Sequence, residues 1–200
     1  MYPDVLIMCS PMECIPPYTL HSILKFAPHS KVILYVSSPI HMDKESLLQK
    51  RLNVLEKATS EYVVFLDADD AFETHIPSIE RLKSHEAHLF HCYDMDSKSS
   101  LSPRNNSVYK LFGFHFAICK RELALNIFRE YQKEHIYRDD VCFLYGILTQ
   151  AKTIKYYNVN LTMKVGSRLA RYAPKYLKTN LEKEVKFVWK PKFKELSVES

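Results

Sequence analysis

Three aspartates, Asp67, Asp69 and Asp70, follow directly after a run of apolar residues at positions 62–66. A run of this kind is typical of a strand that is covered on both faces. Because open α/β sheets bind their ligands at the carboxyl ends of their strands, these carboxylates could bind a divalent cation or a sugar hydroxyl. Mn²⁺ or Mg²⁺ would accept such oxygen ligands and use substrate phosphates to complete the coordination shell. The pattern also allows a second interpretation, in which one of the aspartates only caps a helix that follows.

Two further acidic positions could do chemistry. Asp139 and Asp140 open a helical pattern, and a carboxylate there could accept the proton of an attacking hydroxyl. The alternative is that the pair only caps the helix, which is worth about 1 kcal/mol. Asp94, with Asp96 beside it, follows the apolar run at 87–92. We expect Asp94 to contact hydroxyls of a donor sugar or an acceptor, with a solvated loop as the alternative.

Alternating strand and helix patterns position these acidic residues. Strands are predicted over residues 5–9, 31–36, 62–66, 87–92, 108–117 and 153–159. Helices are predicted over 18–26, 43–58 and 121–133 and from 139 onwards, with another marked by Ile76, Ile79 and Leu82. Residues 97–107, rich in Ser, Asn and Pro, are predicted as a loop. The order of the first 70 residues implies a parallel sheet. We therefore expect an α/β fold, a single Rossmann-type domain with a mostly parallel central sheet flanked by helices.

Composition narrows the class of protein. The chain has 200 residues, enough for one domain, and a net charge of +5 that favours anionic ligands. Its three glycines leave no glycine-rich phosphate loop. The five cysteines form no C-x-x-C pair, which favours buried thiols and a reducing, cytoplasmic location. No apolar run is long enough for a membrane span, and no groove-reading motif indicates a nucleic-acid partner.

One segment resembles a known family. Lys50-Arg51-Leu52-Asn53, together with residues 58–70, is similar to the nucleotide-sugar glycosyltransferases of the GT-A fold, in which a helix with an Arg-x-Asn element precedes a strand that ends in Asp-x-Asp-Asp. The resemblance implies that Asp69 binds the metal that grips the donor diphosphate. It also implies that Asp67 faces the ribose or the same metal, and that Arg51 lies near the nucleotide.

The same resemblance extends to other loops. It implies that Ser10 and Pro11, after the first strand, and Ser37, after the second, hold the nucleobase. Residues 138–143 resemble the second acidic motif of the family, which faces the acceptor. This implies a general base among the two aspartates, and the family usually uses the later one, Asp140, rather than Asp139.

We expect a GT-A-like catalytic domain at 1–163, to which the resemblance applies, followed by a basic, aromatic segment at 164–200 that lacks the periodicity of a core element. Within the domain, the nucleotide-sugar half covers about 1–96 and the acceptor half about 97–163. The basic segment could close over the donor, with Arg168 neutralising the leaving diphosphate, or it could be an ordinary solvated basic face.

The resulting hypothesis is a metal-dependent glycosyltransferase that moves a sugar from a nucleoside diphosphate, with UDP favoured, to a hydroxyl of a glycan or glycoprotein. Two alternatives remain open: a nucleotide- or glycan-binding module without catalysis, and a HAD-like phosphotransferase that uses Asp67 as nucleophile. Length and the missing membrane anchor look similar to bacterial or virus-encoded cytoplasmic enzymes, including chlorella-virus capsid-glycosylating domains. We expect a monomer or one part of a longer chain, in the host cytoplasm if it is viral.

Overall fold

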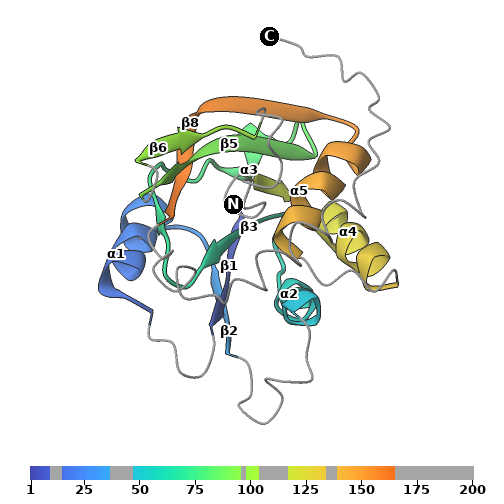
Figure 1. Ribbon diagram of the computed structural model, residues 1–200, viewed down its shortest axis with the longest axis horizontal. Coiled ribbons are helices and arrows are strands. Elements are labelled where there is room, and N and C mark those ends of the chain that lie inside the picture. Colours follow the sequence, from blue (N-terminus) through green and yellow to red (C-terminus); the bar gives the residue numbers. More distant parts are fainter. Residues whose placement is uncertain (10–14, 37–46, 96–97, 104–116, 134–138, 165–200) are drawn as a thin grey trace, which may run out of the picture. The chain divides into compact units, whose positions relative to one another are not determined.

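A mixed sheet lies at the centre of the fold (Figure 1). The computed structural model describes residues 1–9, 15–36, 47–95, 98–103, 117–133 and 139–164, and for residues 47, 133 and 139–142 it describes only the backbone. Within these residues the sheet has eight strands in the order β2-β1-β3-β7-β5-β8-β4, with β6 paired to β5. The strands are β1 (Asp4–Cys9), β2 (Val32–Val36), β3 (Tyr62–Asp67), β4 (Ala71–Phe72), β5 (Ala87–Asp94), β6 (Ser99–Leu101), β7 (Ala117–Lys120) and β8 (Ile154–Lys164).

The first three long strands are parallel, as predicted. β1 pairs with β2 on one side and with β3 on the other, and Met8 lies opposite both Tyr35 and Asp67. Residues 62–66 of β3 are at most 1% exposed, which explains the continuous apolar run in the sequence. The carboxylate of Asp4 accepts hydrogen bonds from the backbone N–H groups of Thr59 and Ser60, at 2.7 and 3.0 Å, and so holds the turn that leads into β3.

The rest of the sheet corrects the expectation of a mostly parallel sheet. β7 runs antiparallel to both β3 and β5, β8 runs parallel to β5, and β4 and β6 are antiparallel to β8 and β5. The strand–helix alternation that produces parallel pairs holds only up to β3. After β3, the chain reaches β4 through a short turn, and the later strand β7 enters the sheet between β3 and β5 in the opposite direction.

Helices cover the two faces of the sheet. They are α1 (Pro17–Phe26), α2 (Leu47–Glu56), α3 (Ile79–Leu82), α4 (Arg121–Lys133) and α5 (Asp139–Gln150). Figure 1 shows α2, α4 and α5 on one side and α1 on the other. On the α4 and α5 side, the ring of Phe65 makes edge contacts with Phe128 and Phe143, at centroid distances of 5.9 and 5.4 Å. The opposite face buries Val64, Leu66 and their neighbours in one apolar cluster.

Three local predictions differ from the structure. The helix expected around residues 76–82 is limited to the four residues of α3, because Pro77 disfavours helical backbone at Ile76. β6 lies inside the segment predicted as a loop, and β8 continues to Lys164, past the predicted end at 159. The strand predicted at 108–117 lies outside the described residues except for its last residue, where β7 begins. The described helices include none that is long and apolar enough to cross a membrane.

Candidate functional site

Asp67, Asp69 and Asp70 lie in a tight turn at the end of β3, which we call the acidic turn. Asp67 is the last residue of the strand, and the backbone N–H of Asp70 donates to the carbonyl of Asp67 at 3.1 Å. The chain then enters β4 at Ala71 and Phe72, where the N–H of Phe72 donates to the Ser22 hydroxyl at 3.1 Å. No helix starts here, so the interpretation of these aspartates as helix caps is wrong.

Arg51 and Asp67, two of the predicted site residues, are in direct contact. The Nη2 of Arg51, on α2, donates to Oδ1 of Asp67 at 2.9 Å. The Arg51 side chain is only 5% exposed and its guanidinium lies 5.2 Å from the centre of the Phe65 ring, whereas Asp67 is 37% exposed. A buried cation therefore holds a carboxylate that faces partly outward, which fixes the head of the acidic turn.

The other two aspartates of the turn differ in exposure. Asp69 is half-buried and Asp70 is almost fully buried, at 2% exposure. The hydroxyl of Tyr18, on α1, donates to the backbone carbonyl of Asp69 at 2.8 Å. Burial raises the pKa of the Tyr18 hydroxyl, and the nearby charges of Asp69 and Asp70 raise it further. No pattern in the sequence marks Tyr18, which lies 51 positions away from Asp69.

A polar network adjoins the ion pair on α2. Asn53, one helical position after Leu52, donates from Nδ2 to the hydroxyl of Tyr35 at 3.2 Å and accepts from Gln49 Nε2 at 2.9 Å. Tyr35 lies opposite Met8, which lies opposite Asp67, so both side chains reach the same edge of the parallel strands. Tyr35 was not predicted as a site residue, although its place two residues before Ser37 could have suggested it.

The predicted residues of the second half are only partly placed. Asp94 ends β5, opposite Ser99 of β6 and Lys164 of β8. Two residues before it, burial raises the pKa of the Cys92 thiol to about 12, and the charge of Asp70 adds to the rise. Asp139 and Asp140 form the first two positions of α5, but their side chains are outside the description. Ser10, Pro11, Ser37 and Arg168 lie outside the described residues.

The donor set fits a metal only in part. Among the described residues, no group of three His, Cys, Asp or Glu side chains could hold an ion. Mg²⁺ and Mn²⁺ sites of nucleotide enzymes use one or two carboxylates, with substrate phosphates and waters as the remaining ligands. Asp69, half-buried and two residues beyond the Arg51-bound Asp67, fits that kind of shared site.

Comparisons with known proteins confirm the fold. No family model and no curated protein matches the sequence. Among solved structures, S. aureus TarS 1–349 in complex with UDP-GlcNAc matches with a TM-score of 0.57 and 15% identity, over 92% of this chain and 66% of that chain. A longer structure of S. aureus TarS matches with a TM-score of 0.56 and 13% identity, and there this chain covers 40% of the other. The chain therefore spans less than two thirds of these TarS structures.

A second kind of structure has a similar fold. The 4-diphosphocytidyl-2C-methyl-D-erythritol synthase from Anaerococcus prevotii matches with a TM-score of 0.53 and 12% identity, over 88% of this chain and 98% of that one. At such identities the similarity concerns the fold alone. It confirms the predicted single α/β domain of GT-A-like fold with flanking helices, in which the sheet is curled and mixed rather than mostly parallel.

Proposed function

We propose that this chain is a metal-dependent glycosyltransferase that uses a nucleoside-diphosphate sugar, with UDP as the favoured nucleotide. The observation that carries the proposal is the ion pair of Arg51 with Asp67 at the head of the acidic turn. It holds the carboxylate of Asp67 at the carboxyl end of a central strand, where α/β sheets bind ligands, and Asp69 follows two residues later in the same turn. The fold shared with S. aureus TarS, solved with UDP-GlcNAc, supports the choice of donor.

The residues of the turn have separate roles in this proposal. Asp69 holds Mn²⁺ or Mg²⁺, which when bound neutralises the charge that develops on the leaving diphosphate. Arg51 keeps Asp67 directed at the ribose or the same cation. Asn53 and Tyr35 offer hydrogen-bonding groups beside the nucleotide. Ser10, Pro11, Ser37 and Arg168 remain predictions for the base and the diphosphate, and Asp94 for hydroxyls of the donor or acceptor sugar.

The acceptor hydroxyl needs a base, and α5 supplies the candidates. Phe143, one turn after Asp139 and Asp140, touches the ring of Phe65, and Phe65 lies two residues before Asp67. The first turn of α5 is thereby tied to the strand that carries the acidic turn. We assign the proton transfer from a glycan or glycoprotein hydroxyl to Asp140, with Asp139 as its neighbour at the helix start. The buried thiols of Cys92 and Cys119 fit a reducing compartment such as the cytoplasm.

Isothermal titration calorimetry with UDP, in the presence and absence of MnCl₂, tests donor binding. We expect UDP to bind the unmodified chain only with Mn²⁺, and Asp69→Ala to abolish this binding. Glu130→Ala, which removes an exposed carboxylate of α4, is the matched control and should bind normally. The proposal would be refuted if UDP bound equally well with and without Mn²⁺, or if the Asp69→Ala variant still bound UDP with Mn²⁺.

Turnover tests the assignment of the base. With UDP-GlcNAc as donor, release of UDP should fall by about 10²–10⁴ in Asp140→Asn, because general-base catalysis contributes about that factor. UDP binding should be unchanged in this variant. Unchanged turnover in Asp140→Asn removes the base role, and binding without any turnover in the unmodified chain favours a binding module instead.

Nucleotidyl transfer is the second candidate, because the synthase from A. prevotii is matched over 98% of its length. Against it, the three glycines of the chain are at positions 113, 146 and 166, so the loop after β1 has none with which to cradle a triphosphate. Replacing UDP by CTP in the same calorimetry separates the two. Tighter Mn²⁺-dependent binding of CTP than of UDP would favour nucleotidyl transfer.

A further inference from the structure

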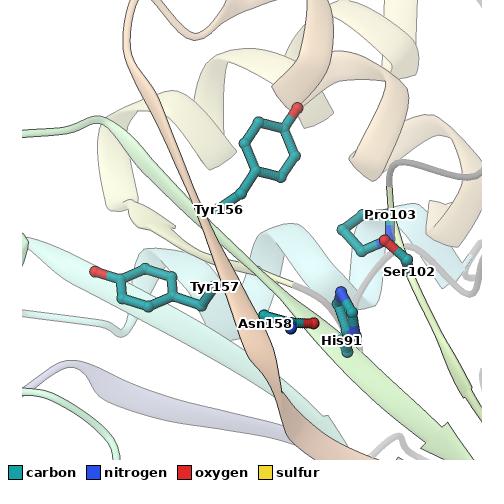
Figure 2. A pocket seen from close by; sticks show the side chains of 6 residues that line it. All are labelled: His91, Ser102, Pro103, Tyr156, Tyr157 and Asn158. Carbon is teal, nitrogen blue, oxygen red and sulfur yellow. The ribbon is translucent and has the colours of Figure 1, made fainter. Parts of the chain in front are cut away.

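A pocket of about 350 Å³ lies where β8 bulges beside β5 (Figure 2). Leu89 pairs with Tyr156 and His91 pairs with Asn160, so residues 157–159 of β8 together lie opposite Phe90 alone. Bulges of this kind re-aim side chains and are frequent beside functional sites. The pocket is lined by His91, Ser102, Pro103, Tyr156, Tyr157 and Asn158.

The side chains that line the pocket are mostly polar, and none is a carboxylate, a lysine or an arginine. The lining consists of hydroxyl, amide and imidazole groups beside two aromatic rings and a proline. Such a lining gives no counter-charge to a phosphate or a metal ion. It suits a neutral ligand that is rich in hydroxyls and has apolar ring faces. The volume is at the small end of the range of ligand pockets, about 300–1,000 Å³, and so suits a single ring.

Neighbouring contacts make the pocket rigid. The ring of Tyr157 stacks on Phe90 with centroids 4.5 Å apart and planes 5° apart, and its hydroxyl lies 3.1 Å from Nδ1 of the buried His88. Figure 2 shows the rings of Tyr156 and Tyr157 leaving the β8 ribbon in different directions. On the other wall, the Ser100 hydroxyl donates to Oδ1 of Asn160 at 2.5 Å and lies 3.4 Å from Nδ1 of His91. Tyr157 and His91 are therefore held in place before a ligand binds.

The register of the sheet relates the pocket to the acidic turn. Val63 of β3 lies opposite Cys119 of β7, which lies opposite Ala87 of β5. Asp67 and His91 are each four residues further along their strands, toward the carboxyl ends. Because side chains alternate with a period of two, both lie on the face of the sheet to which Val63 and Ala87 belong. His91 and Asp67 thus share one face and one end of the sheet.

We propose that this pocket binds one uncharged sugar ring of the acceptor. The assignment to the acceptor rests on the proposed glycosyltransferase function, whereas the preference for a neutral sugar rests on the lining alone. His91 and Asn158 bind hydroxyls of the ring, and Tyr156 provides an apolar surface with a hydroxyl at its tip. The acceptor hydroxyl that reacts is then directed along the sheet toward the turn of Asp67 and Asp69.

Saturation-transfer NMR with three probes tests the pocket: methyl β-D-glucopyranoside, methyl β-D-galactopyranoside and methyl N-acetyl-β-D-glucosaminide. At least one should receive saturation from the unmodified chain. Loss of one hydrogen bond in His91→Ala, Asn158→Ala or Tyr156→Phe should weaken the apparent affinity about five-fold. His21→Ala, which removes an exposed imidazole of α1, is the control and should leave it unchanged. Circular dichroism shows whether each variant is folded.

The outcomes separate this inference from the proposed function. Asp69→Ala should lose Mn²⁺-dependent UDP binding and retain the glycoside signal. No signal from any of the three probes, or equal signals in the folded pocket variants and the control, overturns the pocket whatever the result with UDP. Glycoside binding through the pocket in a chain that never binds UDP with Mn²⁺ overturns only the acceptor role.

Discussion

The buried positive charge of Arg51 is stabilised by two side chains of β3. The Asp67 carboxylate accepts its hydrogen bond at 2.9 Å, and the Phe65 ring lies under the guanidinium at 5.2 Å. A planar guanidinium can make both contacts at once, which a lysine ammonium cannot do in the same way. The residue therefore serves the fold and the proposed donor site together.

Arg51→Ala should lower the free energy of unfolding by about 2–4 kcal/mol, because it leaves a partly buried carboxylate without its cation and removes a packed side chain. Arg51→Lys should lie between this variant and the unmodified chain. Urea unfolding monitored by circular dichroism measures the difference. Arg129→Ala is the matched control: Arg129 lies 3.8 Å from Glu56 and both are more than half exposed, so its loss should cost under about 0.5 kcal/mol. Equal losses for Arg51→Ala and Arg129→Ala would contradict this account.

At the level of residues, the sequence identified the partners at the acidic turn but not their contacts. Arg51 and Asp67 were predicted separately, the first only through resemblance. Their ion pair depends on how α2 packs beside β3, and no local pattern encodes that. Tyr18 and Tyr35 were missed because a tyrosine in a helix or strand has no spacing that marks a site. The loop residues predicted to bind the nucleobase and the diphosphate, Ser10, Pro11, Ser37 and Arg168, stay predictions.

Close packing between α4 and α5 depends on the absence of a side chain at Gly146. A Cβ at this position would lie 2.5 Å from Cγ2 and 2.9 Å from Cγ1 of Ile127, on α4. Both atoms are near the backbone of α4, so the helices would have to separate. The same two helices contribute Phe128 and Phe143 to the surroundings of Phe65, next to the acidic turn.

Gly146→Ala should therefore destabilise the protein by about 1–3 kcal/mol through overpacking, despite the gain of about 1 kcal/mol in helix propensity. In an Ile127→Ala background the penalty should shrink by at least about 1 kcal/mol, since the clashing atoms are gone. A double-mutant cycle in urea measures this coupling. A cycle in which the two effects simply add would show that α4 and α5 are not in close contact here.

At the level of elements, the periodicity of apolar residues and the local composition predicted where most helices and strands lie in the sequence. They predicted few of the directions in which the strands run in the sheet. β1, β3 and α4 follow their apolar patterns closely, because each buries one face or a continuous run, whereas α1 and β2 leave most of their apolar side chains exposed. The order of β7 between β3 and β5 could not be predicted, since both partners are distant in the sequence. Pro77 was a visible signal that should have moved the start of α3 to Ile79.

His88 links distant parts of the whole molecule. Its Nε2 donates to the carbonyl of Leu82 at 2.9 Å, so Nδ1 accepts from the Tyr157 hydroxyl at 3.1 Å, and the neutral imidazole joins β5 to α3 and β8. Burial lowers the pKa of His88 to about 4, and the charges of His85 and Lys155 contribute to the lowering. The side chain is fully buried, which favours the neutral imidazole in the folded state.

The stability of the molecule should therefore depend on pH. Above about pH 6.5 the imidazole is neutral in both states. As the pH falls from 6.5 to 4 the unfolded chain gains a proton that the folded chain does not, so the free energy of unfolding should decrease by up to about 3 kcal/mol. His88→Gln should remove that part of the slope between pH 7 and 4.5, and the exposed control His21→Gln should retain it. Urea midpoints across this range give the measurement, and identical slopes in both variants would contradict the prediction.

The position of β8 has a consequence for how the protein is made. β8 pairs with β5 along its length and also with β4, yet it is the last described strand to leave the ribosome. At a synthesis rate of about 5–20 residues per second, the roughly 60 residues between the end of β5 and the start of β8 take about 3–12 s. During that interval β5, whose side chains are largely buried in the finished fold, lacks its longest partner. We therefore expect the strand that lines the proposed sugar pocket to end the period in which β5 of the nascent chain is open to chaperones and to aggregation.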